Sequence, residues 1–335
     1  MSAPFHENRR QLFLTENYFD NMNALYKEGV ARFVFALKNQ ENDAEDFNRL
    51  SWAIADYRYN HLSLHYTAGE PLDNLRNELE GVVAAYEQYQ KYFGAYEERP
   101  NIALFRFQDI CDYERCMQII GLCFLLHRED LLPRIAKLQD PGYEAEDALY
   151  EDLLAYALDN RHDIEEWYHD NPATLLIEAM HASTDEEASA KLKAYCLAWY
   201  PAMQACPWHD GHLQMTDTDG HYFGYWAFEA GAVAFLLDID DSSIDHMVYP
   251  KDLMSYARKL RNEGATSPDS TVGRLRGLPN EVIPKTGWWH SPAKPNEQYL
   301  HWFEAGQHFP DIHSTSYGSV GWGYDPDEQK ESPKK

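Results

Sequence analysis

Four residues of metal-binding type lie close together in the second half of the chain: Cys206, His209, His212 and His221. Cysteine thiolate and histidine imidazole are ligands that zinc prefers. Their spacing fits no closed structural zinc pattern, so a polar loop between helices, with histidines that form hydrogen bonds, is the favoured interpretation. A metal-dependent hydrolase that uses these four residues remains a less favoured alternative, and no metal or other cofactor is expected.

The sequence contains no common motif of nucleophilic or phosphate-binding chemistry. GxSxG, GKS or GKT, GxGxxG and HExxH are all absent. Carboxylates are abundant, but an acid–base pair needs a pocket that separates the two pKa values, and a sequence does not show a pocket. We therefore expect a protein that is not an enzyme.

The cysteines, the N-terminus and the apolar runs indicate in which cellular compartment the protein is expected. Cys111, Cys116 and Cys123 follow one another in an apolar, helical stretch, where a free thiol behaves as a small buried hydrophobe. Five cysteines in all are an odd number and do not resemble the framework of a small secreted domain. No signal peptide follows Arg9 and Arg10, and no apolar run reaches the length of a membrane span. A reducing cytoplasm is the expected location.

Charge is the first feature that points toward a partner. The chain has 29 basic and 55 acidic residues, a formal net charge of −26. Residues 140–190 contain fifteen Asp or Glu and only one basic residue, Arg161, so 15 − 1 gives −14 for this segment. Such a surface disfavours direct binding to nucleic acid or to an anionic membrane, and favours fast capture of a basic partner.

Apolar residues recur at steps of three and four over most of the first 263 residues, which predicts an all-α fold. Asn171 and Thr184 are expected N-caps, and Pro172 is expected in a first helical turn. A break near Gly29 is left open. Helices are expected at 7–38, 44–67, 72–93, 105–126, 131–138, 144–158, 172–181, 185–203, 222–237 and 250–262.

The composition suggests four parts. A turn at Asp140-Pro141-Gly142, where the sequence becomes acidic, is taken as the main boundary. It separates an N-terminal helical domain (1–139) from a C-terminal one (140–263), each built of antiparallel helix pairs. A Gly- and Trp-rich module of turns and short strands is expected at 264–324, and a disordered tail at 325–335.

One stretch carries a specific signature, rich in aromatic and small residues. Its marked positions are Tyr222, Gly224, Tyr225, Trp226, Glu229, Asp240, Asp241, Tyr249, Pro250 and Asp252. The stretch resembles the C-terminal domain of the PoNi family, immunity proteins paired with the PoNe polymorphic-toxin nucleases, and the likeness extends over roughly residues 7–262. The resemblance implies an all-helical, two-domain protein that protects its producer by binding a DNA-degrading toxin, of a kind that secretion systems deliver between bacteria.

The signature and the acidic segment are expected to do different work. Small residues such as Ala230 and Gly231 allow close helix crossings, so the signature is interpreted as scaffold. The acidic segment is the expected contact surface, since a nuclease must carry Lys and Arg to hold phosphates. The predicted contacts are Glu144, Glu146, Asp147, Glu151, Asp152, Asp163, Glu165 and Glu166, with Trp167 as an aromatic anchor. A general helical scaffold for an endogenous partner is the main alternative, and a homodimer is left open.

Overall fold

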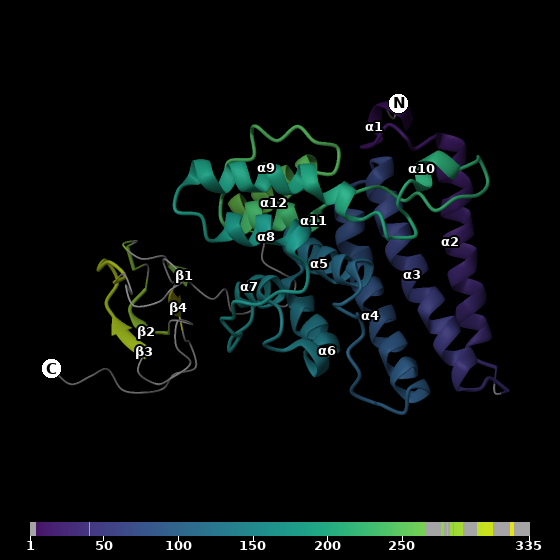
Figure 1. The fold of residues 1–335 in the computed structure, drawn as a ribbon, viewed down its shortest axis with the longest axis horizontal. Coiled ribbons are helices and arrows are strands. Elements are labelled where there is room, and N and C mark those ends of the chain that lie inside the picture. The colour runs from purple at the N-terminus through teal and green to yellow at the C-terminus, as the bar shows by residue number, and fades with distance from the viewer. Residues whose placement is uncertain are drawn as a thin grey trace.

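The computed structural model describes residues 5–39, 41–264, 276–277, 280, 282–283, 285–290, 300–310 and 322–324. Helices dominate these residues, which confirms the all-α class (Figure 1). The first helices are α1 (Phe5–Asn8), α2 (Glu16–Ala36), α3 (Ala44–Ala68) and α4 (Leu72–Tyr96). The others are α5 (Ile110–Leu125), the 3-10 helix η1 (Glu129–Leu131), α6 (Leu132–Tyr143), α7 (Ala148–Ala155), α8 (Asp170–Met180), α9 (Asp185–Ala202), α10 (Gly211–Gln214), α11 (Phe228–Leu236) and α12 (Lys251–Asn262).

The three long N-terminal helices, α2, α3 and α4, lie side by side, with α3 in contact with both neighbours (Figure 1). Side chains fix where two of them begin: Thr15 caps α2 by accepting from the backbone N–H of Tyr18, and Asp43 caps α3 by accepting from that of Asp46. Gly69 ends α3 at a φ of 90°, a left-handed conformation that glycine adopts without steric cost. The close hairpin of α3 and α4 follows from this turn.

Several predicted helix limits need correction. The helix expected at 7–38 is two helices, because the chain is not helical between α1 and α2, and α2 passes Gly29 without a break. The helix expected from residue 222 starts only at Phe228, since Gly224 has a φ of 111°. The predicted turn at 140–142 is also wrong, because these residues form the end of α6.

A single hydrophobic core cluster contains buried residues from Leu14 to Ala257. Helix α5 lies within it: nearly every residue from Tyr113 to Leu125 is buried. Gly121 lets this helix approach the backbone of Phe228 at the start of α11. The core thus draws on elements from both sides of residue 140, where the division into two domains stays a prediction.

The cysteines also differ from expectation. Cys111, at the start of α5, forms a disulfide with Cys206, which lies 95 residues further along the chain. Cys116, Cys123 and Cys196 are free and buried, as expected for core thiols. The prediction for Cys111 failed because the fold brings the start of α5 next to the loop between α9 and α10, and no local pattern reveals that proximity.

The C-terminal module contains short strands, as expected. The strands β1 (Arg276–Gly277), β2 (Gly287–His290), β3 (Leu300–Phe303) and β4 (Trp322–Tyr324) form one antiparallel sheet in the order β1-β4-β2-β3. Ile283, Trp289 and Phe309 form a small core of their own. The tail predicted at 325–335 lies outside the described residues. In the part of the chain that the structure describes, no helix is long and apolar enough to cross a membrane.

Candidate functional site

Glu151, predicted as a contact residue, is instead fully buried under the acidic segment. Its two carboxylate oxygens accept hydrogen bonds from the guanidinium of Arg161, each at 2.8 Å. They also accept bonds from the backbone N–H groups of Ala145 and His162 at 2.8 and 3.0 Å. Asp140 binds the other side of Arg161 at 2.9 and 3.0 Å. Glu151 therefore joins the turns on both sides of α7 and is not available to a partner.

Asp147 is also buried and also corrects the prediction. Its carboxylate caps α7 by accepting the backbone N–H of Tyr150 at 2.9 Å. It further accepts the backbone N–H of Tyr168 at 3.0 Å and the hydroxyl of Tyr113 at 3.1 Å. Burial raises the pKa of this carboxyl to about 6, against the opposing effect of these hydrogen bonds. The residue holds the loop after α7 and cannot contact a toxin in this fold.

The other predicted contact residues do reach the surface. Exposed carboxylates flank α7 on both sides, before its start and in the loop toward α8: Glu144, Glu146, Asp163, Glu165 and Glu166. Asp152 is half-buried and accepts from His181 at 3.0 Å. Trp167 is half-buried as well, and its ring N–H donates to Thr174 at 3.0 Å. The structure thus reduces the predicted acidic surface to two exposed stretches at the ends of α7.

The signature residues make mostly internal contacts, many of them with the N-terminal helices. The Trp226 ring N–H donates to the hydroxyl of Thr67 on α3 at 2.9 Å. A side chain at Gly224 would overlap this same pair. Asp252 near the start of α12 accepts from the guanidinium of Arg10 and the hydroxyl of Tyr66. These bonds tie residues 222–252 to the first third of the chain.

Further signature carboxylates are held within the C-terminal half. Glu229 is 1% exposed and accepts from the hydroxyl of Tyr195 at 2.7 Å, and burial raises its pKa to about 7. Buried Asp241 accepts from Tyr249 and from Arg258, each at 2.8 Å. Pro250 is buried next to Tyr249, while Asp240 lies at the surface and accepts the backbone N–H of Ser242 at 2.9 Å.

Gln11 makes a connection that sequence reasoning missed. This side chain is buried between α1 and α2, and its amide N–H₂ donates to the backbone carbonyls of Tyr225 at 2.6 Å and Met247 at 2.9 Å. Its amide oxygen accepts from the hydroxyl of Tyr222 at 2.6 Å and from the backbone N–H of Tyr225 at 3.0 Å. One glutamine thereby satisfies four polar groups of residues 222–247.

The predicted metal candidates are not brought together as a set of ligands. Cys206 is committed to its disulfide, so it offers no thiolate. The ring of His209 stacks on that of Tyr200, with centroids 4.3 Å apart. His212 shares a hydrogen bond of 2.7 Å with the hydroxyl of Tyr225, and His221 is exposed. Of the three histidines, His209 packs on a ring and His212 forms a hydrogen bond, while His221 lies at the surface.

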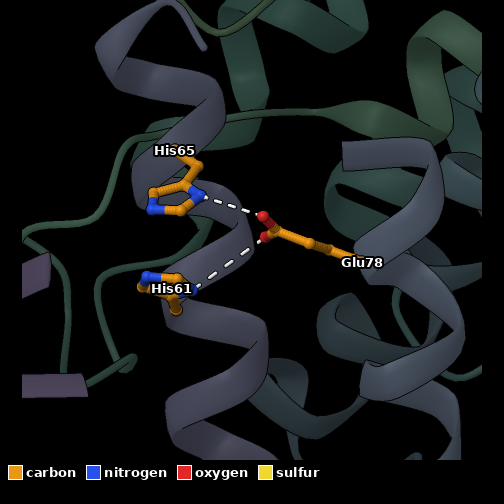
Figure 2. Close-up of side chains that lie close together, drawn as sticks. All are labelled: His61, His65 and Glu78. Atoms are coloured by element: carbon orange, nitrogen blue, oxygen red, sulfur yellow. Dashed lines mark hydrogen bonds and ion pairs between the residues drawn. The ribbon is translucent and has the colours of Figure 1, made fainter. Parts of the chain in front are cut away.

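A different group has metal-binding geometry: His61 and His65 on α3, and Glu78 on α4 (Figure 2). The histidines are four residues apart, so they lie on one face of the helix, with ring centroids 3.8 Å apart. His65 Nδ1 lies 3.3 Å from one oxygen of Glu78, and His61 Nδ1 lies 4.0 Å from the other. The spacing HxxxH was visible in the sequence, but Glu78 comes from the next helix.

Electrostatic effects are strong at this group. Burial, followed by the neighbouring His65, lowers the pKa of His61 to about 4. Burial alone would raise the pKa of Glu78, but the hydrogen bond and the charge of His65 bring it below its usual value. His61 and Glu78 line a pocket of about 410 Å³ between α2, α3 and α4, with Lys27 and Arg58 also on its wall.

Comparisons with known proteins agree with the observed architecture. Residues 145–253 match the family model of the PoNe immunity proteins (PoNi), C-terminal. The chain also resembles the crystal structure of protein PA2201 from Pseudomonas aeruginosa, with a TM-score of 0.59 and 19% identity, over 75% of this chain and 91% of that chain. At this identity the likeness concerns the fold alone. No curated protein matches. The matched segment runs from just before α7 to the start of α12 and contains the whole signature, so this part of the chain is similar to the C-terminal domain of PoNi-type immunity proteins.

Proposed function

We propose that this protein neutralises a cognate antibacterial toxin by binding it directly, without catalysing a reaction. The match of residues 145–253 to the PoNi C-terminal domain carries the proposal. The toxin would be a DNase delivered between bacteria by a secretion system, and the immunity protein would act in the cytoplasm of the producer, where such a nuclease does its damage.

The exposed carboxylates at the two ends of α7 are the proposed contact surface. Glu144 and Glu146 precede the helix, and Asp163, Glu165 and Glu166 follow it. A nuclease holds phosphates with Lys and Arg, and carboxylates bind the same groups through charge-assisted hydrogen bonds. The formal net charge of −26 also accelerates the encounter with a basic partner.

The buried carboxylates support this surface from beneath. Arg161 holds Glu151 and Asp140 together, and Asp147 fixes the loop that carries Glu165 and Glu166. Carboxylates held in place lose less conformational entropy on binding than carboxylates on a mobile loop. Half-buried Trp167, next to Glu166 in the chain, supplies apolar area at the edge of this surface.

Charge reversal tests the proposal. A variant with Lys at Glu144, Glu146, Glu165 and Glu166 is compared with a matched control that has Lys at Asp20, Glu28, Glu41 and Glu45, four exposed acids of the N-terminal half. Both variants change the net charge equally. We expect the first to bind the toxin at least tenfold more weakly and to lose protection on co-expression, with a reduced salt dependence of the affinity, because only it removes contacts.

The affinity of each variant for the purified toxin is measured by calorimetry at low and at high salt. Equal losses in both variants would show that net charge alone acts, and no loss in either would reject this surface. If the toxin does not bind the unmodified protein at all, the immunity role itself is wrong.

A further inference from the structure

Three side chains of metal-binding type converge between α3 and α4, apart from the proposed toxin surface. His61, His65 and Glu78 each offer one ligand atom, and these atoms all lie within 4.8 Å of one another (Figure 2). Two imidazoles and one carboxylate are a ligand set that zinc and related divalent metals accept. We propose that these residues bind a divalent transition-metal ion of the zinc type.

Asn23 on α2 decides which imidazole nitrogen faces the glutamate. Its amide oxygen lies 2.8 Å from Nε2 of His61 and 3.1 Å from Nε2 of His65. An amide oxygen only accepts, so both Nε2 atoms carry a proton and donate to it. Both Nδ1 atoms then face the carboxylate of Glu78, and His65 Nδ1 lies at hydrogen-bond distance from it, 3.3 Å, so a proton on this nitrogen is donated to the carboxylate. A divalent cation would take the place of that proton between the rings and the carboxylate.

The same contact provides the support that metal-bound histidines usually have. In metalloproteins a ligating imidazole donates its other ring N–H to an oxygen acceptor, which fixes the ring and its tautomer. Asn23 serves both rings at once here. The histidine side chains are 16% and 9% exposed, so they are largely enclosed before any ion arrives.

The distances fit tetrahedral coordination after a small movement. Zinc bonds of about 2.0–2.1 Å place two ligand atoms of a tetrahedron roughly 3.3 Å apart. His65 Nδ1 and its nearer Glu78 oxygen are already at 3.3 Å, whereas His61 Nδ1 is 4.0 Å from the other oxygen. Glu78 is the most exposed of the three and has the freedom to turn between the rings.

The pocket gives an ion a route from solvent. It is lined by His61 and Glu78, and it leaves room for water as a fourth ligand. Lys27 and Arg58 on the same wall repel a divalent cation, so the affinity must come from direct coordination and not from the field of the pocket. A bound ion would join α3 to α4 directly and α2 through Asn23.

Cobalt titration tests the site, because Co²⁺ replaces zinc and absorbs visible light when tetrahedral. The full chain is treated with chelator, returned to chelator-free buffer and titrated with Co²⁺, and then Zn²⁺ is added to displace it. We expect one equivalent to bind with the absorption of a tetrahedral site. His61→Gln and Glu78→Gln are each expected to weaken binding at least tenfold, while the control pair His162→Gln and His181→Gln, which lie at the acidic segment, bind as the parent does.

The variant Asn23→Asp distinguishes a metal site from a group of residues that only form hydrogen bonds with one another. A carboxylate accepts from both Nε2 atoms, so this variant is expected to bind Co²⁺ more tightly than the parent. Weaker binding in Asn23→Asp would mean that the amide donates to the rings, which overturns the proposal. So would an absence of stoichiometric Co²⁺ binding, or equal binding by parent and His61→Gln when circular dichroism shows both to be folded. None of these outcomes depends on the toxin.

Discussion

The acidic segment and the signature both contain carboxylates among aromatic residues, yet they use them differently. In the signature, Glu229 and Asp241 are buried and bound to neighbouring side chains, and Asp252 is held by Arg10 and Tyr66. In the acidic segment only a minority of the carboxylates are buried, and the exposed ones gather at the two ends of α7. The partners that folding brings to a carboxylate decide its role, whereas the density of carboxylates in the sequence does not.

The largest loss of stability is expected for Glu151→Ala, which removes the central carboxylate of the buried network in the acidic segment. It leaves the guanidinium of Arg161, only 6% exposed, with Asp140 as its remaining carboxylate, and two backbone N–H groups without their acceptor. Breaking a buried ion pair costs about 3–5 kcal/mol. Denaturant unfolding measures this loss. Exposed Glu146→Ala serves as the control and should change stability by less than about 0.5 kcal/mol; similar losses in both variants would contradict the division into buried and exposed carboxylates.

A smaller change, in the pH dependence of stability, is expected when Glu229 in the signature is changed to Gln. The folded protein raises this pKa from 4.5 to about 7, so between these values the folded state holds the proton that the unfolded state has lost. Stability therefore falls as pH rises from about 4.5 to about 7, by about 3 kcal/mol at 1.36 kcal/mol per unit. Glu229→Gln should remove this fall, as measured by unfolding at a series of pH values.

The exposed acid Glu16 provides the control for this experiment, and Glu16→Gln should keep the pH dependence of the parent. Asp147, with its pKa raised to about 6, contributes a similar fall from the acidic segment, which Glu229→Gln leaves in place. A pH profile unchanged in Glu229→Gln would show that Glu229 is not the group responsible.

The smallest loss of stability is expected for Thr67→Val, which tests the hydrogen bond between α3 and Trp226 of the signature. The valine keeps the shape but removes the acceptor for the ring N–H of Trp226. An unsatisfied buried donor costs about 1–3 kcal/mol. Thermal or denaturant unfolding measures it, with exposed Thr218→Val as the matched control. Parent-like stability in Thr67→Val would mean that this hydrogen bond contributes little.

The sequence predicted the helices well where local chemistry sets their limits. Thr184 caps α9 as expected, and the helix at 170–180 has non-helical angles at Asn171 before it continues from Pro172. The predictions failed where distant residues intervene. The side chain of Gln11 binds residues 222–247, and its stretch of chain is not helical. The disulfide joins Cys111 in α5 to Cys206, 95 residues further along.

The candidate sites show the same limit. The acidic composition pointed to the carboxylates around α7, but only the fold shows that Glu151 is buried and bound to Arg161. HxxxH at His61 and His65 is a local signal, whereas Glu78 and Asn23 come from two other helices. The sequence pattern therefore shows the two histidines of this site but not the two residues that other helices bring to it.

The contacts of Gln11 also bear on the order in which the protein is completed. This residue leaves the ribosome early, but its hydrogen-bond partners at Tyr222, Tyr225 and Met247 are synthesised more than two hundred residues later. A nascent chain that already contains α2, α3 and α4 still lacks these partners of the Gln11 side chain. The buried contacts of the Gln11 side chain therefore form only after residue 247 has been synthesised.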